Sequence, residues 1–525
     1  MTSTPSTHDT DMLVHDDRRK RQILFASCAA LMAVIASVTG LNVAQQELAL
    51  DFGASQSTVL WIINAYALAL AAMLMPVGAI GDRWGRKPVL LAGLAVFVVA
   101  TAAAAFAPSS TFMIIVRVVA GVSAAMIMPV TLSVITSTFP EEERAQAIGV
   151  WAGVAGGGGL IGMFVAALMV DLVDWRWLFV LPIALAVVAA VATVRAVPNS
   201  REQTDQPFDL QGSLLSMVAV SGLVFAIHEG PVHGWSDSVT LLALLGGLLA
   251  TLGFVVTERR SPAPLLDVRV FGDRRLATGS VALIVLFGVL GGVFIVLFPY
   301  FQGVLGWSAL RSTAALLPMG LLMMASSGLA PKLATAVGNR TTSLAGIGIA
   351  GGGLATMAML VSVDGGYLSV LPGMLVIGTG MGLTMTPSTE AITASLPADR
   401  QGVASALNDT TRELGSALGV ALLGAVLSAG YRDAIGPRLV GFPDDLAAVA
   451  GEGLGAAHGV AAQAGARATL LLDSAELAFV EAWSRSMWAG VIAMAVLFAY
   501  VFLAAPGKDA AEAAVAPPEV PQPTR

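Results

Sequence analysis

Charged residues at helical spacing stand in an otherwise apolar stretch near residue 410. Asp409 and Glu413 are four residues apart and share one face of a helix, and Arg412 can pair with Asp409 three residues earlier. A carboxyl group held in low dielectric favours its neutral form and can take up and release a proton. The alternative, a salt bridge of Arg412 with one of the two acids, stays open. Asn408 adds an amide that can contact a polar ligand.

Two further charged residues fall inside apolar runs. Glu390 is the last residue of the stretch 384–390, and Arg117 is the first residue of the sequence Arg-Val-Val-Ala-Gly121. An arginine at the centre of a membrane helix costs about 2.5–3.5 kcal/mol on insertion scales. Arg117 is therefore expected to face the protein interior, although snorkelling to the outer surface is the alternative.

The composition indicates a membrane protein with many spans. Of 525 residues, 56% are apolar and only 12% are charged, whereas a soluble domain has about 25% charged residues. No basic stripe with interleaved aromatic residues is present, so we expect no nucleic-acid partner. The single cysteine, Cys28, and five scattered histidines suggest neither a disulfide nor a metal site.

Fourteen segments have the roughly 20 predominantly apolar residues that a membrane-spanning helix needs. They lie at about 22–44, 58–79, 88–107, 111–135, 146–169, 177–195, 210–228, 239–257, 276–303, 312–331, 341–362, 366–389, 401–429 and 486–505. With the N-terminus inside, inner segments hold 20 of the 28 Lys and Arg residues, and outer segments hold six. Cytoplasmic loops of membrane proteins are enriched in Lys and Arg, so both termini are expected in the cytoplasm. Asp409 then lies about 12 Å from the inner end of its span.

A glycine-rich and basic stretch separates the second and third spans. It reads Gly78-Ala-Ile-Gly-Asp82-Arg83-Trp-Gly85-Arg86-Lys87-Pro88. The glycines allow close backbone approach, and Asp82 can accept hydrogen bonds from the N-terminal amides of a neighbouring helix. An ordinary basic membrane loop is the alternative interpretation.

An internal repeat divides the chain. Gly85-Arg-Lys-Pro-Val-Leu-Leu-Ala-Gly93 recurs as Gly338-Asn-Arg-Thr-Thr-Ser-Leu-Ala-Gly346 with the same glycine spacing, which fits two related six-helix halves. We expect a cytoplasmic tail at 1–21, a first half at 22–195, an inserted helix pair with its linkers at 196–275, a second half at 276–505 with a long outer loop at 431–485, and a disordered tail at 506–525. Within that loop, residues 466–483 have helical apolar spacing and could lie on the outer surface.

The stretch from Gly78 to Lys87 resembles the signature loop of the major facilitator superfamily, and the chain as a whole resembles its fourteen-span drug:proton antiporters, the QacA-like multidrug exporters. The resemblance implies an all-α membrane protein with the major facilitator fold. It implies a conformational latch at Gly78, Asp82, Arg83, Gly85, Arg86 and Lys87, and a role for Arg117 in proton coupling. We hypothesise that Asp82, Arg83 and Arg86 latch the cytoplasmic ends of the first-half helices in the outward-open state. Gly158 and Gly162 loosely match an antiporter signature of the family, and close helix packing is the alternative role for both.

Two departures from the family pattern matter. Ser37 and Asn64 stand where relatives carry acids, which shifts the predicted proton site to Asp409, Glu413 and Glu390. The substrate cavity is expected to include Ser37, Asn42, Trp61, Asn64, Tyr66 and Asn408.

The resulting hypothesis is proton-coupled efflux of amphipathic drugs or toxic small molecules across a bacterial cytoplasmic membrane. Export of an endogenous metabolite or self-made antibiotic is the alternative, and proton-coupled uptake comes third. No phosphate-binding loop for ATP occurs, and no nucleophile–base pair supports an enzyme. The expected partners are a small-molecule substrate, protons and the lipid bilayer, with no cofactor and no metal, in a monomeric protein.

Overall fold

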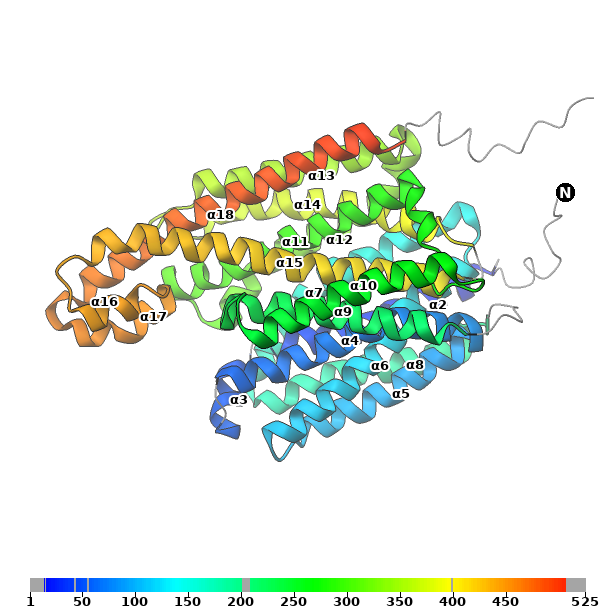
Figure 1. Ribbon diagram of the computed structural model, residues 1–525, viewed down its shortest axis with the longest axis horizontal. Helices are drawn as coiled ribbons and strands as arrows, with labels where there is room; N and C mark the ends of the chain where they lie inside the picture. Colours follow the sequence, from blue (N-terminus) through cyan, green and yellow to red (C-terminus); the bar gives the residue numbers. More distant parts are fainter. Residues whose placement is uncertain are drawn as a thin grey trace, which may run out of the picture.

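The computed structural model describes residues 14, 16–41, 44–53, 56–200, 208–397 and 400–506. In this part of the chain, fourteen helices are long and apolar enough to cross a membrane, which confirms the predicted number of spans and the all-α class. They form an elongated bundle (Figure 1). Lipid offers no hydrogen-bond partners, so a spanning segment must satisfy its own backbone groups, as a helix does.

The first six membrane helices are α2 (Asp17–Gly40), α4 (Gln56–Trp84), α5 (Arg86–Ala105), α6 (Ser110–Thr138), α7 (Glu141–Leu172) and α8 (Val180–Ala196). The next two are α9 (Leu210–His233) and α10 (Ser238–Arg260). The last six are α11 (Arg274–Pro299), α12 (Ala309–Val337), α13 (Asn339–Leu360), α14 (Gly366–Thr393), α15 (Gln401–Ile435) and α18 (Ala468–Ala504). Short helices between them are α3 (Gln45–Phe52), η1 (Trp175–Phe179), η2 (Val268–Gly272), η3 (Tyr300–Val304), η5 (Gly436–Leu439), α16 (Asp444–Ala450), α17 (Leu454–Val460) and η6 (Ala461–Arg467).

The bundle has two distinct ends (Figure 1). Helix α2 begins and α18 ends at one of them, called here the termini end. Helices α16 and α17 lie at the other, called here the cap end.

The internal repeat has a structural counterpart. Gly85 and Gly338 each precede a helix, α5 and α13, with left-handed φ values of 111° and 89°. Because only glycine adopts such a φ without strain, the two glycines direct the chain in the same way at equivalent points. A hydrophobic core cluster draws mainly on the first six helices and another on the last six.

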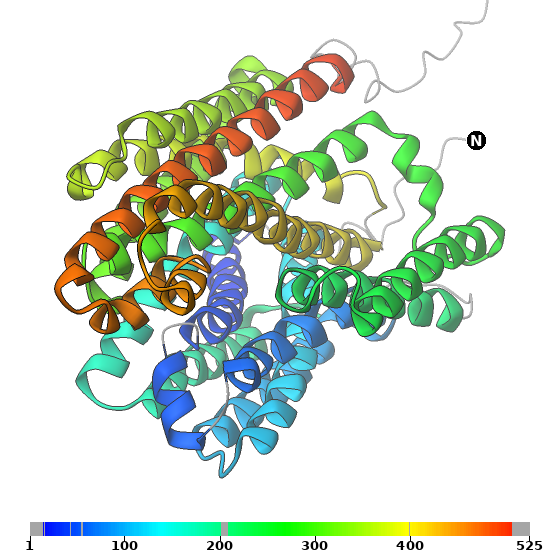
Figure 2. The same ribbon diagram turned by 60° about the vertical axis from the view of Figure 1, so that its left-hand side comes forward.

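Helix α15 occupies a central place in this arrangement. It packs against α4 and α6, against α11, α14 and α18, and against α9. It therefore touches both groups of six helices and the pair between them. Helices α9 and α10 form a hairpin beside α4 and α15 (Figure 2), and α10 packs mainly on α9.

The cap end differs from the expected 431–485 loop. Helix α15 continues to Ile435, and α18 already begins at Ala468, so that the connection is shorter and itself largely helical. The helical spacing predicted for 466–483 is confirmed, because most of this stretch forms the first half of α18, which is continuous with the last span. Trp483 is buried there and donates a hydrogen bond to Met357 O at 3.1 Å. That the stretch lies at the outer surface stays a prediction.

The second span is also longer than expected. Helix α4 runs to Trp84, so Gly78, Asp82 and Arg83 lie on its last turns instead of in a loop. Only Gly85 interrupts the path into α5.

Candidate functional site

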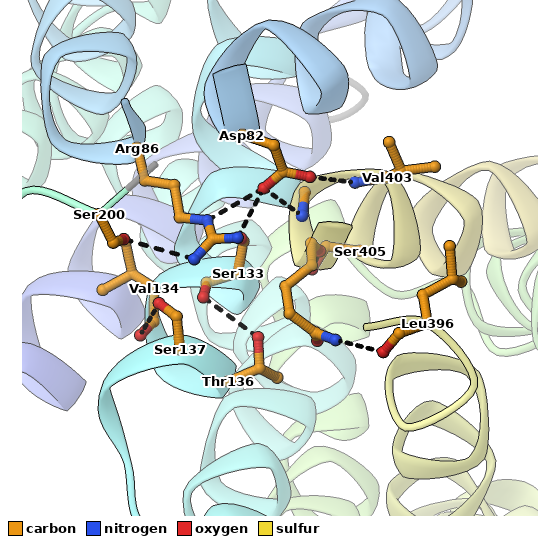
Figure 3. A network of polar contacts seen from close by, with 12 residues as sticks. Asp82, Arg86, Ser133, Val134, Thr136, Ser137, Ser200, Leu396, Val403 and Ser405 are labelled. Carbon is orange, nitrogen blue, oxygen red and sulfur yellow. Dashed lines mark hydrogen bonds and ion pairs between the residues drawn. The ribbon is translucent and has the colours of Figure 1, made fainter. Parts of the chain in front are cut away.

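The termini end holds a buried network around Asp82 (Figure 3). Asp82 Oδ1 accepts hydrogen bonds from Arg86 Nε at 3.0 Å and Nη2 at 2.8 Å, and both residues are 1% exposed. Arg86 Nη1 also donates to Ser200 Oγ at 3.4 Å, and its backbone amide to Ser200 O. The one-residue break at Gly85 brings the start of α5 back to the last turn of α4, which allows this pairing.

The carboxylate of Asp82 also reaches across to α15. Its Oδ1 accepts from Gly402 N at 2.7 Å, and its Oδ2 accepts from Val403 N at 3.1 Å. The first amides of a helix have no partner within it, and the helix dipole favours an anion there. Arg400, which precedes α15, makes no capping bond through its side chain, so Asp82 takes that role. These are the amide contacts that the sequence predicted for Asp82.

Glycine is required on both sides of this contact. A Cβ at Gly402 would lie 2.3 Å from Gly78 O and 2.7 Å from Asp82 Oδ1, and a Cβ at Gly78 would lie 2.5 Å from Gly402 O. The two backbones therefore touch directly. The sequence analysis identified Gly78 but missed Gly402, whose place at the start of a span was the available signal.

The other residues of the motif lie around this contact. Lys87 Nζ donates to Val194 O at 2.9 Å, which ties α5 to α8. Arg83 is half-buried at the end of α4. We expected a latch among helices of the first half, whereas the bonds of Asp82 to α15 join the first half to the second.

A second polar cluster lies on α15, two turns farther from the termini end. Asp409 is 0% exposed and Arg412 6%. Asp409 Oδ1 lies 3.6 Å from Arg412 Nη1 and accepts a hydrogen bond from Asn408 Nδ2 at 3.1 Å. Asp409 Oδ2 and Arg412 Nε have no hydrogen-bond partner among the residues that the structure describes. Buried polar groups are normally paired, so this cluster retains capacity to bind a ligand or a proton.

Two aromatic rings hold the guanidinium group of Arg412. It lies 4.4 Å from the ring centroid of Phe287 on α11 and 5.5 Å from that of Trp151 on α7. Trp151 is fully buried and donates to Thr131 Oγ1 at 3.1 Å. The cation thus sits between helices of the two halves. Sequence reasoning missed both rings, because no local spacing links residues 151, 287 and 412.

The other two predicted acids are less buried. Glu413 is half-buried on α15, within electrostatic reach of the Tyr66 hydroxyl group. Glu390 is half-buried near the end of α14, where the charge of Arg144 acts on it. It lines a cavity of about 950 Å³ at the termini end, together with Arg275 and Arg340. The structure does not bring Glu390 into the Asp409 cluster.

Arg117 faces the protein interior, as predicted. It is 1% exposed, its Nη1 donates to Ser37 Oγ at 3.0 Å, and its Nε donates to Ile62 O at 3.3 Å. Its guanidinium group lies 4.1 Å from the centroid of the Tyr66 ring, and Nη2 has no hydrogen-bond partner within the described part of the chain. Ser37 therefore meets Arg117 with a neutral hydroxyl group, so this contact supplies no carboxylate to neutralise the charge of Arg117.

The residues predicted to form a substrate cavity are dispersed. Ser37 and Tyr66 surround Arg117, while Asn408 belongs to the Asp409 cluster. Trp61 lies 5.7 Å, centroid to centroid, from Phe225 of α9, and Asn64 is half-buried on α4. Asn42 lies outside the described residues.

The glycines of α7 serve helix packing on two sides. A Cβ at Gly158 would lie 2.8 Å from Met32 Sδ, and one at Gly162 would lie 3.1 Å from Ala36 Cα, both on α2. On the other side, a Cβ at Gly157 would lie 2.4 Å from Gly320 O of α12. This geometry favours close packing, the alternative that the sequence left open.

Within the described residues, no group of three His, Cys, Asp or Glu side chains could hold a metal ion. The geometry above leaves two candidate functional centres, the Asp82 contact and the Asp409 cluster. One joins the halves at the termini end, and the other places an unsatisfied charge pair between them.

Comparisons with known proteins agree with this architecture. Residues 25–420 match the model of the Major Facilitator Superfamily. The multidrug efflux pump LfrA of Mycolicibacterium smegmatis is 33% identical over 87% of this chain and 88% of its own. The tetracenomycin C resistance and export protein of Streptomyces glaucescens is 31% identical over 78% and 76%.

Among solved structures, the proton:xylose symporter XylE superposes with a TM-score of 0.60 at 13% identity, over 95% of this chain and 100% of that one. At this identity the likeness concerns the fold alone, and it confirms the predicted facilitator fold. From the family match and the close relatives, the chain belongs to the Major Facilitator Superfamily.

Proposed function

We propose that this protein exports amphipathic drugs or other toxic small molecules from the bacterial cytoplasm in exchange for protons. The observation that carries the proposal is the buried Asp409–Arg412 pair, which is incompletely hydrogen-bonded and lies between the two halves. A carboxyl group in this position binds either a proton or a cation, which is the competition that exchange needs. The similarity to LfrA, a multidrug efflux pump, supports drugs as substrates.

The Asp82 contact is the proposed conformational latch. Its bonds hold α4 of the first half to α15 of the second, which closes the bundle at the termini end. The basic residues concentrated in the segments near this end favour the cytoplasm there. The structure would then correspond to the outward-facing state of a monomer with both termini inside. Protons that enter release about 2.3 kcal/mol per charge per 100 mV, in addition to the pH gradient.

Transport into everted vesicles tests the function and the proton site together. A panel of dyes and antibiotics should accumulate when a pH gradient is imposed. Asp409→Asn should abolish that accumulation but leave downhill exchange of substrate, because the amide cannot release a proton. Glu413→Gln should be milder, since this residue is only half-buried. Asp51→Asn, a substitution of the same kind in a half-exposed ion pair with Arg176, is the matched control.

The alternatives have distinct outcomes in the same assay. Asp409→Asn vesicles that still build a substrate gradient would contradict the assignment and direct attention to Glu390. A single accumulated compound instead of many would favour a dedicated metabolite or antibiotic exporter, the second candidate. That candidate draws support from the similarity to the tetracenomycin C export protein. Substrate movement with the protons would indicate uptake.

A further inference from the structure

Two carboxyl groups meet at the termini end of the α9–α10 pair. Asp209 caps α9, and its Oδ1 accepts a hydrogen bond from Gly212 N at 2.7 Å. Glu258 lies in the last turns of α10 and is 2% exposed. The side chains of Asp209 and Glu258 lie next to each other, and the charge of Asp209 acts on Glu258. Since an ionised carboxylate only accepts hydrogen bonds, the two groups can bond to each other only when one of them carries a proton.

Gly212 makes room for the two oxygen atoms. A Cβ at this position would lie 2.0 Å from Glu258 Oε1 and 2.8 Å from Asp209 Oδ2, so the two atoms converge on one point. Glu258 Oε1 receives no hydrogen bond from a described donor. Two charged carboxylates this close, one of them buried, repel each other strongly, whereas a shared proton converts the repulsion into a bond.

The pair holds the linker that leads into the second half. Leu265 N donates to Asp209 Oδ2 at 3.2 Å, and Leu266 N donates to Glu258 Oε2 at 3.1 Å. Both leucines are buried, at 5% and 3% exposure, in the core cluster of the first half. Two adjacent amides of residues 261–267 therefore depend on the two carboxyl groups.

The same linker contacts the start of α15. Arg400 Nη1 donates to Pro264 O at 3.3 Å, and α15 then presents the amides of Gly402 and Val403 to Asp82. A continuous set of bonds thus leads from the carboxyl pair to the Asp82 contact. The charged groups on the elements packed around the pair are Arg83, Arg259, Arg260, Asp267, Arg269 and Arg400.

We propose that Asp209 and Glu258 form a proton-binding site, separate from Asp409, which fastens the linker 261–267 to the start of α15. In the fastened state Glu258 Oε1 carries the proton and faces Asp209 Oδ2. When the proton leaves, the Glu258 carboxylate repels that of Asp209, the two side chains separate, and the amides of Leu265 and Leu266 are released. The inserted helix pair thereby makes closure of the termini end sensitive to pH. This role goes beyond export and does not depend on which substrate is carried.

Hydrogen exchange of the purified protein in lipid nanodiscs tests the site without a transport assay. The readout is the protection of the Leu265 and Leu266 amides, resolved by mass spectrometry and corrected for the intrinsic effect of pH on exchange. In the wild type, protection should fall about tenfold or more between about pH 6 and about pH 9. Glu258→Gln supplies a permanent hydrogen, so its protection should stay within about twofold over the same range.

A steric variant separates charge from packing. Gly212→Ala should expose both amides at every pH, because its Cβ displaces Glu258 although no titratable group changes. Gly246→Ala on α10, where a Cβ meets nothing within 4 Å, is the matched control and should behave like the wild type.

Protection that does not change with pH in the wild type would overturn the proposal, as would its loss in Glu258→Gln. Protection that follows Na⁺ or Ca²⁺ at constant pH would also overturn it and assign a metal ion to the pair. Should Gly212→Ala fail to fold, the comparison of Glu258→Gln with the wild type still decides. None of these readouts involves substrate, so failure here leaves the export proposal intact.

Discussion

Asp82→Asn should open the bundle at the termini end. The substitution preserves shape but removes the charge that faces the first amides of α15. A hydrogen bond to a charged acceptor contributes about 1.5–3 kcal/mol. An amide keeps one acceptor oxygen, so at least one bond to α15 is lost, together with about 0.3–1 kcal/mol of attraction to the helix dipole. A loss of about 2–4 kcal/mol shifts the closed-to-open ratio about 30-fold to about 700-fold.

Spin-label distances measure this shift directly. Labels at Arg195 on α8 and Ala336 on α12, both exposed, report the separation of the halves once Cys28 is replaced by serine. In nanodiscs, Asp82→Asn should raise the long-distance population, and Asp51→Asn should not. Transport should slow while substrate affinity stays nearly unchanged. An unaltered distance distribution, or a collapse of affinity with turnover preserved, would refute the latch and move the motif into the binding site.

Three further predictions concern packing and charge. Gly402→Ala should open the same contact sterically and slow transport as Asp82→Asn does, whereas Gly352→Ala, in open space, should be neutral in both the distance and the transport assay. Ser37→Asp should pair with the buried guanidinium group of Arg117 and raise the midpoint of thermal unfolding; an unchanged or lower midpoint would contradict this. Trp151→Leu should reduce proton-driven efflux about tenfold or more, because a ring in contact with a desolvated cation contributes about 2 kcal/mol, while Trp151→Phe should retain most activity; equal effects would indicate that the bond to Thr131 matters instead.

The sequence predicted what depends on local pattern. Apolar runs are long in lipid-spanning helices, so the number of spans followed from counting them, and the charged residues at 409 and 412 were recognisable by their spacing. The same reasoning identified Asp82 as an acceptor for helix amides. It could not identify the helix that donates them, because Gly402 lies 320 positions after Asp82 in the sequence. For the same reason it assigned the latch to one half.

Helix ends were predicted less well than helix number. Residues 466–483 have an apolar pattern that suits a separate helix as well as an extension of a span, and in the structure most of them extend the helix of the last span. The carboxyl pair of Asp209 and Glu258 was missed as well. These residues are separated by a whole helical hairpin, and each alone resembles an ordinary charge at a helix end.

The direct backbone contact between Gly78 and Gly402 has a kinetic consequence. An N–H···O bond of 2.7 Å leaves the useful range after a displacement of about 1 Å, and two backbones in contact lose their dispersion attraction over a similar distance. A partly open arrangement would therefore retain neither the hydrogen bonds nor the backbone contact. The two halves should therefore separate in a single step with one activation barrier. Where this separation limits the rate, the temperature dependence of turnover would report the breaking of the contact between Gly78 and Gly402.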